Sequence, residues 1–131
     1  MIQLQQIDHV ALRVNDLGRS LRWYVEVLGM ERRYAEAWRD RPAVVCAGGT
    51  CLALFAALPD EAPADPRAPG MLHLAFRVDA AGFAAAQAGL DGHGIAWTIS
   101  DHGISHSIYF YDPDGYRLEI TTYELEALAK G

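Results

Sequence analysis

The stretch Ser107-Ile-Tyr-Phe-Tyr-Asp-Pro-Asp-Gly-Tyr-Arg-Leu-Glu119 predicts two strands joined by a tight turn, and the second strand carries a carboxylate. Asp112-Pro113-Asp114-Gly115 forms the turn, because proline fixes φ and glycine admits a positive φ. Side chains alternate between the two faces of a strand, so Glu119 faces away from its apolar neighbours Leu118 and Ile120. A carboxylate among apolar strand residues needs a partner, because burying an unpaired charge is costly.

An internal repeat runs through the chain. Met71-Leu-His-Leu-Ala-Phe-Arg-Val78 matches Ile7-Asp-His-Val-Ala-Leu-Arg-Val14 at a constant offset of 64 residues, and the same order of helix and strand patterns follows each copy. The final strands of the two copies also correspond, with Leu52-Ala53 opposite Leu118-Glu119. The modules span about residues 5–57 and 71–124, and a proline-rich connector covers 58–70. We therefore expect one α+β domain over residues 1–131. It would contain two paired βαβββ modules that form a concave, partly closed mixed sheet with helices on the outside.

The periodicities predict individual elements. In the first module we expect a helix at Leu17–Leu28 and strands at Ile7–Val14, Glu31–Trp38, Ala43–Ala47 and Thr50–Ala56. In the second module we expect a helix from about Asp79 to Gly92 and strands at Met71–Val78, Trp97–Ser100, Ser107–Tyr111 and Arg117–Thr122. The faces expected to pack beneath the helices carry Val10, Leu12, Val14, Leu72, Leu74, Phe76 and Val78.

Composition excludes several classes of function. The chain has 131 residues, a formal net charge of −6 and Lys130 as its single lysine, so it offers no basic surface for nucleic acid. It also lacks a basic patch or a long apolar run for a membrane. No segment resembles a secretory signal, so we expect a cytoplasmic protein. In that compartment Cys46 and Cys51 are expected to be buried thiols rather than a disulfide.

Two histidines and the glutamate form a candidate metal site. His9 and His73 occupy equivalent positions of the repeated strands, and both face the predicted concave surface together with Glu119. Two imidazoles and one carboxylate suit Fe(II) or Mn(II), leave positions open for substrate, and also accept Ni(II) or Zn(II). The alternative is that the histidines have backbone partners and the glutamate lies on the surface. The repeated placement of the histidines favours the metal.

These motifs resemble the vicinal oxygen chelate superfamily. That superfamily includes glyoxalase I, extradiol ring-cleavage dioxygenases, fosfomycin-modifying thiol transferases and bleomycin-binding proteins. The resemblance covers nearly the whole chain through the stretches Ile7–Val14, Leu28–Met30, Leu72–Phe76 and Tyr109–Glu119. It implies a metal-dependent enzyme for a small molecule, with His9, His73 and Glu119 as ligands, and it implies a homodimer.

Single residues distinguish between the branches of the superfamily. Glyoxalase I resembles this scaffold but uses a fourth acidic ligand where this chain has Ala53, which argues against isomerase or lyase chemistry. Bleomycin-binding proteins lack the metal ligands that this chain retains. Thiol transferases need cations for a phosphonate, whereas the loop before Ser107 has none, and Ala11 and Ile99 replace residues typical of that branch.

Extradiol dioxygenases match best. The resemblance runs from His102 through Tyr109 to Glu119, with Ser100 departing from the pattern. It implies that His102 is the acid/base beside dioxygen and that Tyr109 hydrogen-bonds a catecholate oxygen. A solvated loop histidine is the alternative for His102, and the role of His106 stays open. We predict an iron-dependent dioxygenase acting on an aromatic diol, with the glyoxalase-like, thiol-transferase and non-catalytic binding functions as alternatives.

Overall fold

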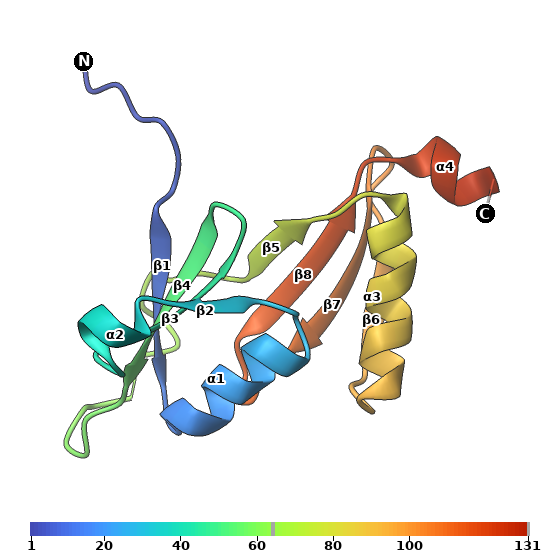
Figure 1. Cartoon of the computed structure of the whole chain (residues 1–131). Coiled ribbons are helices and arrows are strands. Elements are labelled where there is room, and N and C mark those ends of the chain that lie inside the picture. The colour runs from blue at the N-terminus through green and yellow to red at the C-terminus, as the bar shows by residue number, and fades with distance from the viewer. Residues whose placement is uncertain (64, 131) are drawn as a thin grey trace. The chain divides into compact units, whose positions relative to one another are not determined.

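The fold consists of two compact units, Met1–Ala64 and Asp65–Gly131, and each is described by itself. The structure is a computed structural model that describes residues 1–63 and 65–130. Residue 64, in the predicted connector, and residue 131, at the end of the predicted domain, lie outside the described residues. Each unit contains a four-stranded mixed sheet (Figure 1). The units correspond to the predicted modules, so the α+β class and the duplicated βαβββ arrangement are confirmed. The single-domain organisation stays a prediction.

The first unit builds its sheet in the order β1-β4-β3-β2, with β1 and β4 parallel and the other pairs antiparallel. Its elements are β1 (His9–Val14), α1 (Leu17–Glu26), β2 (Glu31–Arg33), α2 (Ala35–Trp38), β3 (Ala43–Ala47) and β4 (Thr50–Ala56). The Asp16 carboxylate caps α1 by accepting the Arg19 N–H at 3.0 Å. Tyr24 of α1 is fully buried, as are Leu52 and Leu54 on alternate positions of β4. This apolar face supports the strand that carries His9.

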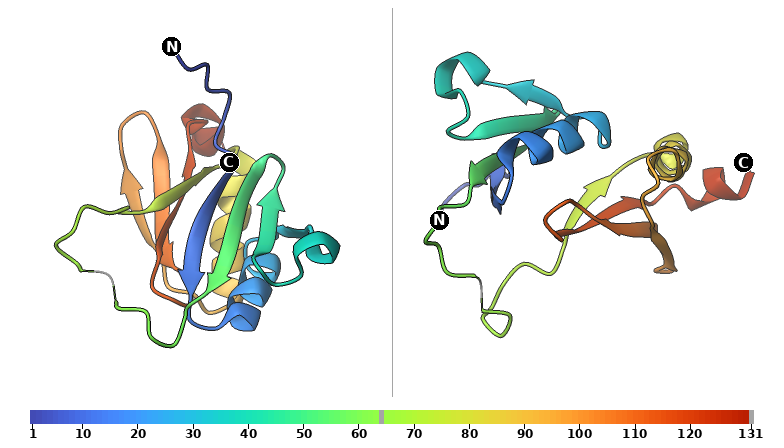
Figure 2. Two further views of the ribbon diagram at one scale, coloured as in Figure 1. Left: turned by 90° about the vertical axis from the view of Figure 1, so that its left-hand side faces the viewer. Right: turned by 90° about the horizontal axis from the view of Figure 1, so that it is seen from below.

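The second unit repeats the same strand order as β5-β8-β7-β6. Its elements are β5 (Leu74–Arg77), α3 (Ala80–Gly92), β6 (Thr98–Asp101), β7 (His106–Tyr111), β8 (Arg117–Thr122) and α4 (Leu125–Lys130). Helix α3 lies along the sheet (Figure 2). Its residues Phe83 and Leu90 are buried. Asp112 accepts the backbone N–H groups of Asp114 and Tyr116 at 2.9 Å each, which closes the predicted turn between β7 and β8.

The first and last strands of each module pair in equivalent registers in the two sheets. Ala11 pairs with Ala53 in the first sheet, and Ala75 pairs with Glu119 in the second. Because Ala75 is the repeat equivalent of Ala11, Ala53 occupies the position that corresponds to Glu119. The predicted correspondence of the final strands is therefore confirmed.

The predicted strand Glu31–Trp38 is wrong in its second half. Strand β2 ends at Arg33, and Tyr34 adopts a left-handed conformation with φ of 63° before α2 begins. A non-glycine residue rarely adopts this conformation, so the alternation of the side chains did not predict that the strand would end at this turn. The result is a short helix where an extended strand was expected.

The start of the second module also differs from the expectation. Strand β5 begins at Leu74 rather than at Met71, so Leu72 lies outside the ladder and is 86% exposed instead of packed. The C-terminal helix α4 was not predicted. Residues 57–63 and 65–73 contain no helix or strand, and the connector stays a prediction (Figure 2). Within the described residues, no helix is both long and apolar enough to cross a membrane.

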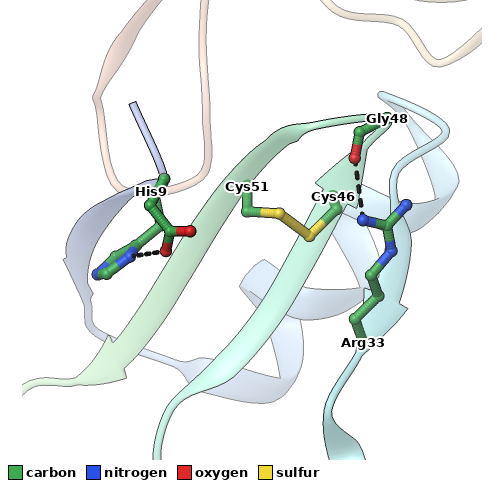
Figure 3. The surroundings of a disulfide bond; sticks show 6 residues. His9, Arg33, Cys46, Gly48 and Cys51 are labelled. Atoms are coloured by element: carbon green, nitrogen blue, oxygen red, sulfur yellow. Dashed lines mark hydrogen bonds and ion pairs between the residues drawn. A yellow bond between two sulfur atoms is a disulfide. The ribbon is translucent and has the colours of Figure 1, made fainter. Parts of the chain in front are cut away.

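Cys46 and Cys51 form a disulfide, which corrects the prediction of buried thiols (Figure 3). The Gly48-Gly49 turn places Cys46 directly opposite Cys51 on the neighbouring strands β3 and β4, and their Cα atoms lie 4.1 Å apart. Directly opposed residues of an antiparallel pair can bring their sulfur atoms into bonding range. The expectation drawn from the compartment ignored this local pairing.

The disulfide predicts the reactivity of the two cysteines. Alkylation of the purified, denatured protein with iodoacetamide should add no group without reductant and two groups after reduction, as measured by intact mass. A Cys46→Ser/Cys51→Ser variant provides the control, because it should gain no mass in either condition. Two alkyl groups on the unreduced wild type would contradict the disulfide.

Candidate metal centre

The second unit brings together two of the three predicted metal ligands. Glu119 lies on β8 and is 8% exposed, while His73 immediately precedes β5, the strand that pairs with β8. His73 Nε2 and Glu119 Oε1 are 3.0 Å apart. The parallel pairing of the two strands thus places an imidazole nitrogen against a buried carboxylate oxygen.

A hydroxyl chain fixes the other oxygen of this carboxylate. Ser107 is fully buried on β7, and its Oγ lies 2.7 Å from Glu119 Oε2 and 2.9 Å from Thr121 Oγ1. An ionised carboxylate only accepts hydrogen bonds, and a serine hydroxyl has one proton. Ser107 therefore donates to Glu119, and Thr121 donates to Ser107 or to the His106 carbonyl oxygen at 3.2 Å. This arrangement leaves Oε1 directed at His73.

The geometry of the pair fits a metal. Two adjacent ligands at about 2.1 Å from a six-coordinate ion are about 3.0 Å apart, which equals the separation of His73 Nε2 and Glu119 Oε1. His73 Nδ1 is buried without a hydrogen-bond partner among the described residues. The protein groups alone therefore do not satisfy this imidazole. An imidazole and a carboxylate suit Fe, Mn, Ni or Zn, so these two residues fit a divalent metal.

The third predicted ligand belongs to the first unit. His9 begins β1 (Figure 3). Its Nδ1 lies 2.8 Å from the Asp8 carboxylate. A carboxylate on one ring nitrogen orients a histidine and leaves the other nitrogen for a ligand. His9 is thus prepared to bind through Nε2. No group of three or more potential metal-binding His, Cys, Asp or Glu side chains is gathered within residues 1–63 or within residues 65–130.

The two predicted catalytic residues contact each other. His102 Nε2 lies 2.9 Å from the Tyr109 hydroxyl, and the Tyr109 ring centroid is 5.9 Å from that of His73. Tyr109 lies directly opposite Glu119 in the ladder between β7 and β8. Burial, followed by the neighbouring Glu119 carboxylate, raises the pKa of the Tyr109 phenol above its ordinary value. The phenol is therefore protonated at neutral pH and able to donate a hydrogen bond.

Arg117 is a candidate site residue that the sequence reasoning did not select. Its guanidinium carbon lies 4.2 Å from the centroid of the Tyr109 ring. This distance is typical of a cation–π contact, which places a positive charge on one side of the phenol. The signal was present in the sequence, because Arg117 and Glu119 are two residues apart on one strand and therefore share a face.

His106 has a different environment from that of His102. Its Nε2 lies 3.5 Å from the carboxylate of Asp101, the residue opposite it on β6. The pKa of Asp101 is lowered, first by the Gly103 N–H and then by the nearby histidines. His106 is thus engaged in a local ion pair when it is protonated.

Comparison with known proteins identifies the family. A family model of the Glyoxalase/Bleomycin resistance protein/Dioxygenase superfamily matches residues 6–120. The chain belongs to this superfamily. A solved glyoxylase/bleomycin resistance protein/dioxygenase domain from Frankia has a TM-score of 0.78 and 27% identity, and the likeness covers 92% of this chain and 99% of that one.

Curated relatives are similar over most of the chain. The uncharacterized protein YaeR of Escherichia coli is 31% identical, covering 92% of this chain and 98% of its own. The glutathione transferase FosA of Serratia marcescens is 29% identical, covering 95% of this chain and 85% of its own. The catechol-2,3-dioxygenase of Bacillus subtilis is 32% identical over 87% of this chain, which spans 40% of that enzyme.

Loss of the Ser107 hydroxyl should destabilise the metal-free protein. In Ser107→Ala, Glu119 Oε2 loses its donor while remaining buried, so we expect the free energy of unfolding to fall by about 1–3 kcal/mol. Urea denaturation followed by circular dichroism measures the change. Ser100→Ala is the matched control, because Ser100 pairs with Ser107 in the sheet but is only half buried, and it should shift stability by no more than about 0.5 kcal/mol. Equal effects of the two variants would contradict the proposed role of Ser107.

Proposed function

We propose that this chain is a metal-dependent dioxygenase that cleaves the ring of a catechol-like small molecule. The observation that carries the proposal is the hydrogen bond between His102 Nε2 and the Tyr109 hydroxyl, 2.9 Å long, beside the pair of His73 and Glu119. An acid/base group joined to a phenol, next to metal-binding side chains, suits the deprotonation of a diol.

In this proposal His9, His73 and Glu119 hold Fe(II), with Mn(II), Ni(II) or Zn(II) as alternatives. When bound, the metal would supply the open coordination positions and the redox chemistry that dioxygen requires. Asp8 orients the His9 ring through Nδ1 at 2.8 Å, and Ser107 orients Glu119 through Oε2 at 2.7 Å. The supporting residues therefore direct one ring nitrogen and one carboxylate oxygen outward as ligands.

Tyr109 and His102 would handle the substrate and its protons. The neutral Tyr109 phenol donates a hydrogen bond to a substrate oxygen as negative charge develops there. His102 accepts the proton that leaves the substrate hydroxyl and later returns it to the product. Arg117, above the Tyr109 ring, stabilises negative charge near the phenol.

Thiol transfer is the second candidate, and Arg117 is the observation in its favour. A phosphonate substrate needs a cation near the metal, and Arg117 supplies one beside Tyr109. The similarity to FosA of Serratia marcescens also extends over 95% of the chain. Against this candidate, β6 carries Ile99 rather than a cation, and β1 carries Ala11 rather than a hydroxyl. Glyoxalase-like chemistry is less favoured, because Ala53 offers no fourth ligand, and non-catalytic binding of a small molecule is the remaining alternative.

We further propose that the protein is a cytoplasmic homodimer. The support is the superfamily, in which members bind small molecules and often form dimers. Sedimentation equilibrium should give a mass of twice 14.4 kDa. A mass of a single chain at micromolar concentration would contradict the dimer.

The dioxygenase proposal predicts turnover of catechols by the iron-loaded protein. Fe(II)-loaded wild type should convert at least one catechol, with consumption of one O₂ per ring and formation of a yellow product. His73→Ala and Glu119→Ala should lose both stoichiometric metal and turnover. His93→Ala is the control, because His93 lies at the end of α3 and is exposed. A metal-loaded protein that turns over no catechol but conjugates a thiol to fosfomycin would overturn the proposal in favour of the second candidate.

The pair of His102 and Tyr109 predicts a separate effect on rate. His102→Gln and Tyr109→Phe should retain the metal and lower kcat about 10²- to 10⁴-fold for His102 and less for Tyr109, because each removes a proton-handling group. Steady-state kinetics with parallel metal analysis measures both quantities. Unchanged kcat in both variants would exclude these residues from the chemistry.

A further inference from the structure

The first unit contains a cavity that the proposed chemistry does not yet use. Its volume is about 480 Å³, within the range of sites that hold small molecules. Val44 and Ala53 line it and are each 4% exposed, and Cys51 lines it beside them. Because Leu52 and Leu54 point to the opposite face of β4 and are fully buried, the cavity lies on the face of the sheet away from the apolar core. His9 is also part of its lining.

Exposed aromatic rings line the same cavity. Tyr34 immediately precedes α2 and Trp38 is its last residue; their ring centroids are 5.0 Å apart, and they are 54% and 49% exposed. Phe55 adds a third ring, which is 45% exposed. Several large, accessible aromatic side chains at one concave surface are typical of a site for a flat apolar ligand.

The segment that carries two of these rings is held in a costly conformation. Tyr34 and Arg39, on either side of α2, have φ values of 63° and 56°, which are unusual for residues other than glycine. Arg32 fixes the segment by donating hydrogen bonds to the Arg39 carbonyl at 3.0 Å and to the Asp40 carboxylate at 2.5 Å. Backbone strain of this kind persists where the surroundings over-determine it, and it clusters at ligand sites.

Arg41 gives the cavity its charge preference. It lines the cavity, and its guanidinium has no hydrogen-bond or ion-pair partner within residues 1–63 and 65–130. Asp8 also lines the cavity, but its carboxylate is paired with His9 Nδ1 at 2.8 Å. A guanidinium binds a carboxylate through two parallel hydrogen bonds, so Arg41 is suited to an anionic ligand group.

We propose that this cavity binds an aromatic ring that bears a carboxylate, with Arg41 gripping the carboxylate and Tyr34 and Trp38 packing on the ring. The inference rests on the proposed function, because it names the substrate class of the same site as a catechol with an acidic substituent. His9, at the edge of the cavity, would then meet the diol end of the ring, while Arg41 holds the acidic end.

Calorimetric titration of the metal-free protein tests this inference without turnover. The probes are 3,4-dihydroxybenzoate and its uncharged analogue 3,4-dihydroxybenzyl alcohol, titrated in the presence of a chelator at neutral pH. The wild type should bind the acid at least about tenfold more tightly than the alcohol, because one charge-assisted pair is gained. Arg41→Gln should remove this preference and leave the affinity for the alcohol within about twofold.

Arg39→Gln is the matched control. It removes the same charge two residues away from Arg41, at a position that does not line the cavity, and it should keep the preference for the acid. Trp38→Leu should weaken both ligands about fivefold, because the ring contact is lost for each. Thermal melting checks that every variant is folded. A wild type without preference for the acid, or an equal loss in Arg39→Gln and Arg41→Gln, would overturn the inference.

The outcomes also separate this inference from the proposed function. An Arg41-dependent preference for the acid in a protein that cleaves no catechol would support the proposed ligand of the cavity and contradict the proposed dioxygenase activity. Cleavage of uncharged catechols at the same rate in wild type and Arg41→Gln, with no preference for the acid, would support the proposed dioxygenase activity and contradict the proposed ligand of the cavity.

Discussion

The buried carboxylate of Glu119 is the constraint on which the second unit depends. It is 8% exposed, and an ionised group in such a place must be paired. The sheet meets this need from two sides, with the Ser107 hydroxyl on one oxygen and His73 Nε2 on the other. The strand order β5-β8-β7 is what brings both partners to β8. Ser107 therefore has a fold-related reason to be polar in the interior of a sheet.

The duplicated modules differ at the position of this carboxylate. The two sheets share their strand order and register, yet Ala53 stands where the second unit has Glu119. The first unit therefore has no buried acid to satisfy at this position. Its equivalent surface becomes the floor of an apolar cavity lined by aromatic rings and Arg41. In the functions proposed above, the second module would supply His73 and Glu119 to the metal, and the first would supply the cavity that selects the substrate.

Periodicity and the repeat predicted the sheets, the helices α1 and α3 and the correspondence of Ala53 with Glu119, because each depends on alternation or spacing along the chain. The pairing of His73 with Glu119 and of His102 with Tyr109 is compatible with the site expected from family motifs. The short helix α2 was not predicted, because it depends on a left-handed conformation at Tyr34 that tertiary contacts impose. The disulfide was not predicted, because the expected cytoplasmic location was given more weight than the pairing of Cys46 with Cys51 across a two-residue turn.

The proposed metal centre requires His9 to bind the same ion as His73 and Glu119. Its most direct test is a crystal structure of the Fe(II)-loaded protein with anomalous data collected at the iron edge. One strong peak is expected at about 2.0–2.2 Å from His73 Nε2, Glu119 Oε1 and His9 Nε2. A contact from His9 of the same chain or from His9 of a second copy would meet this prediction. A peak bound elsewhere, or one that His9 does not contact, would rule out this three-residue centre.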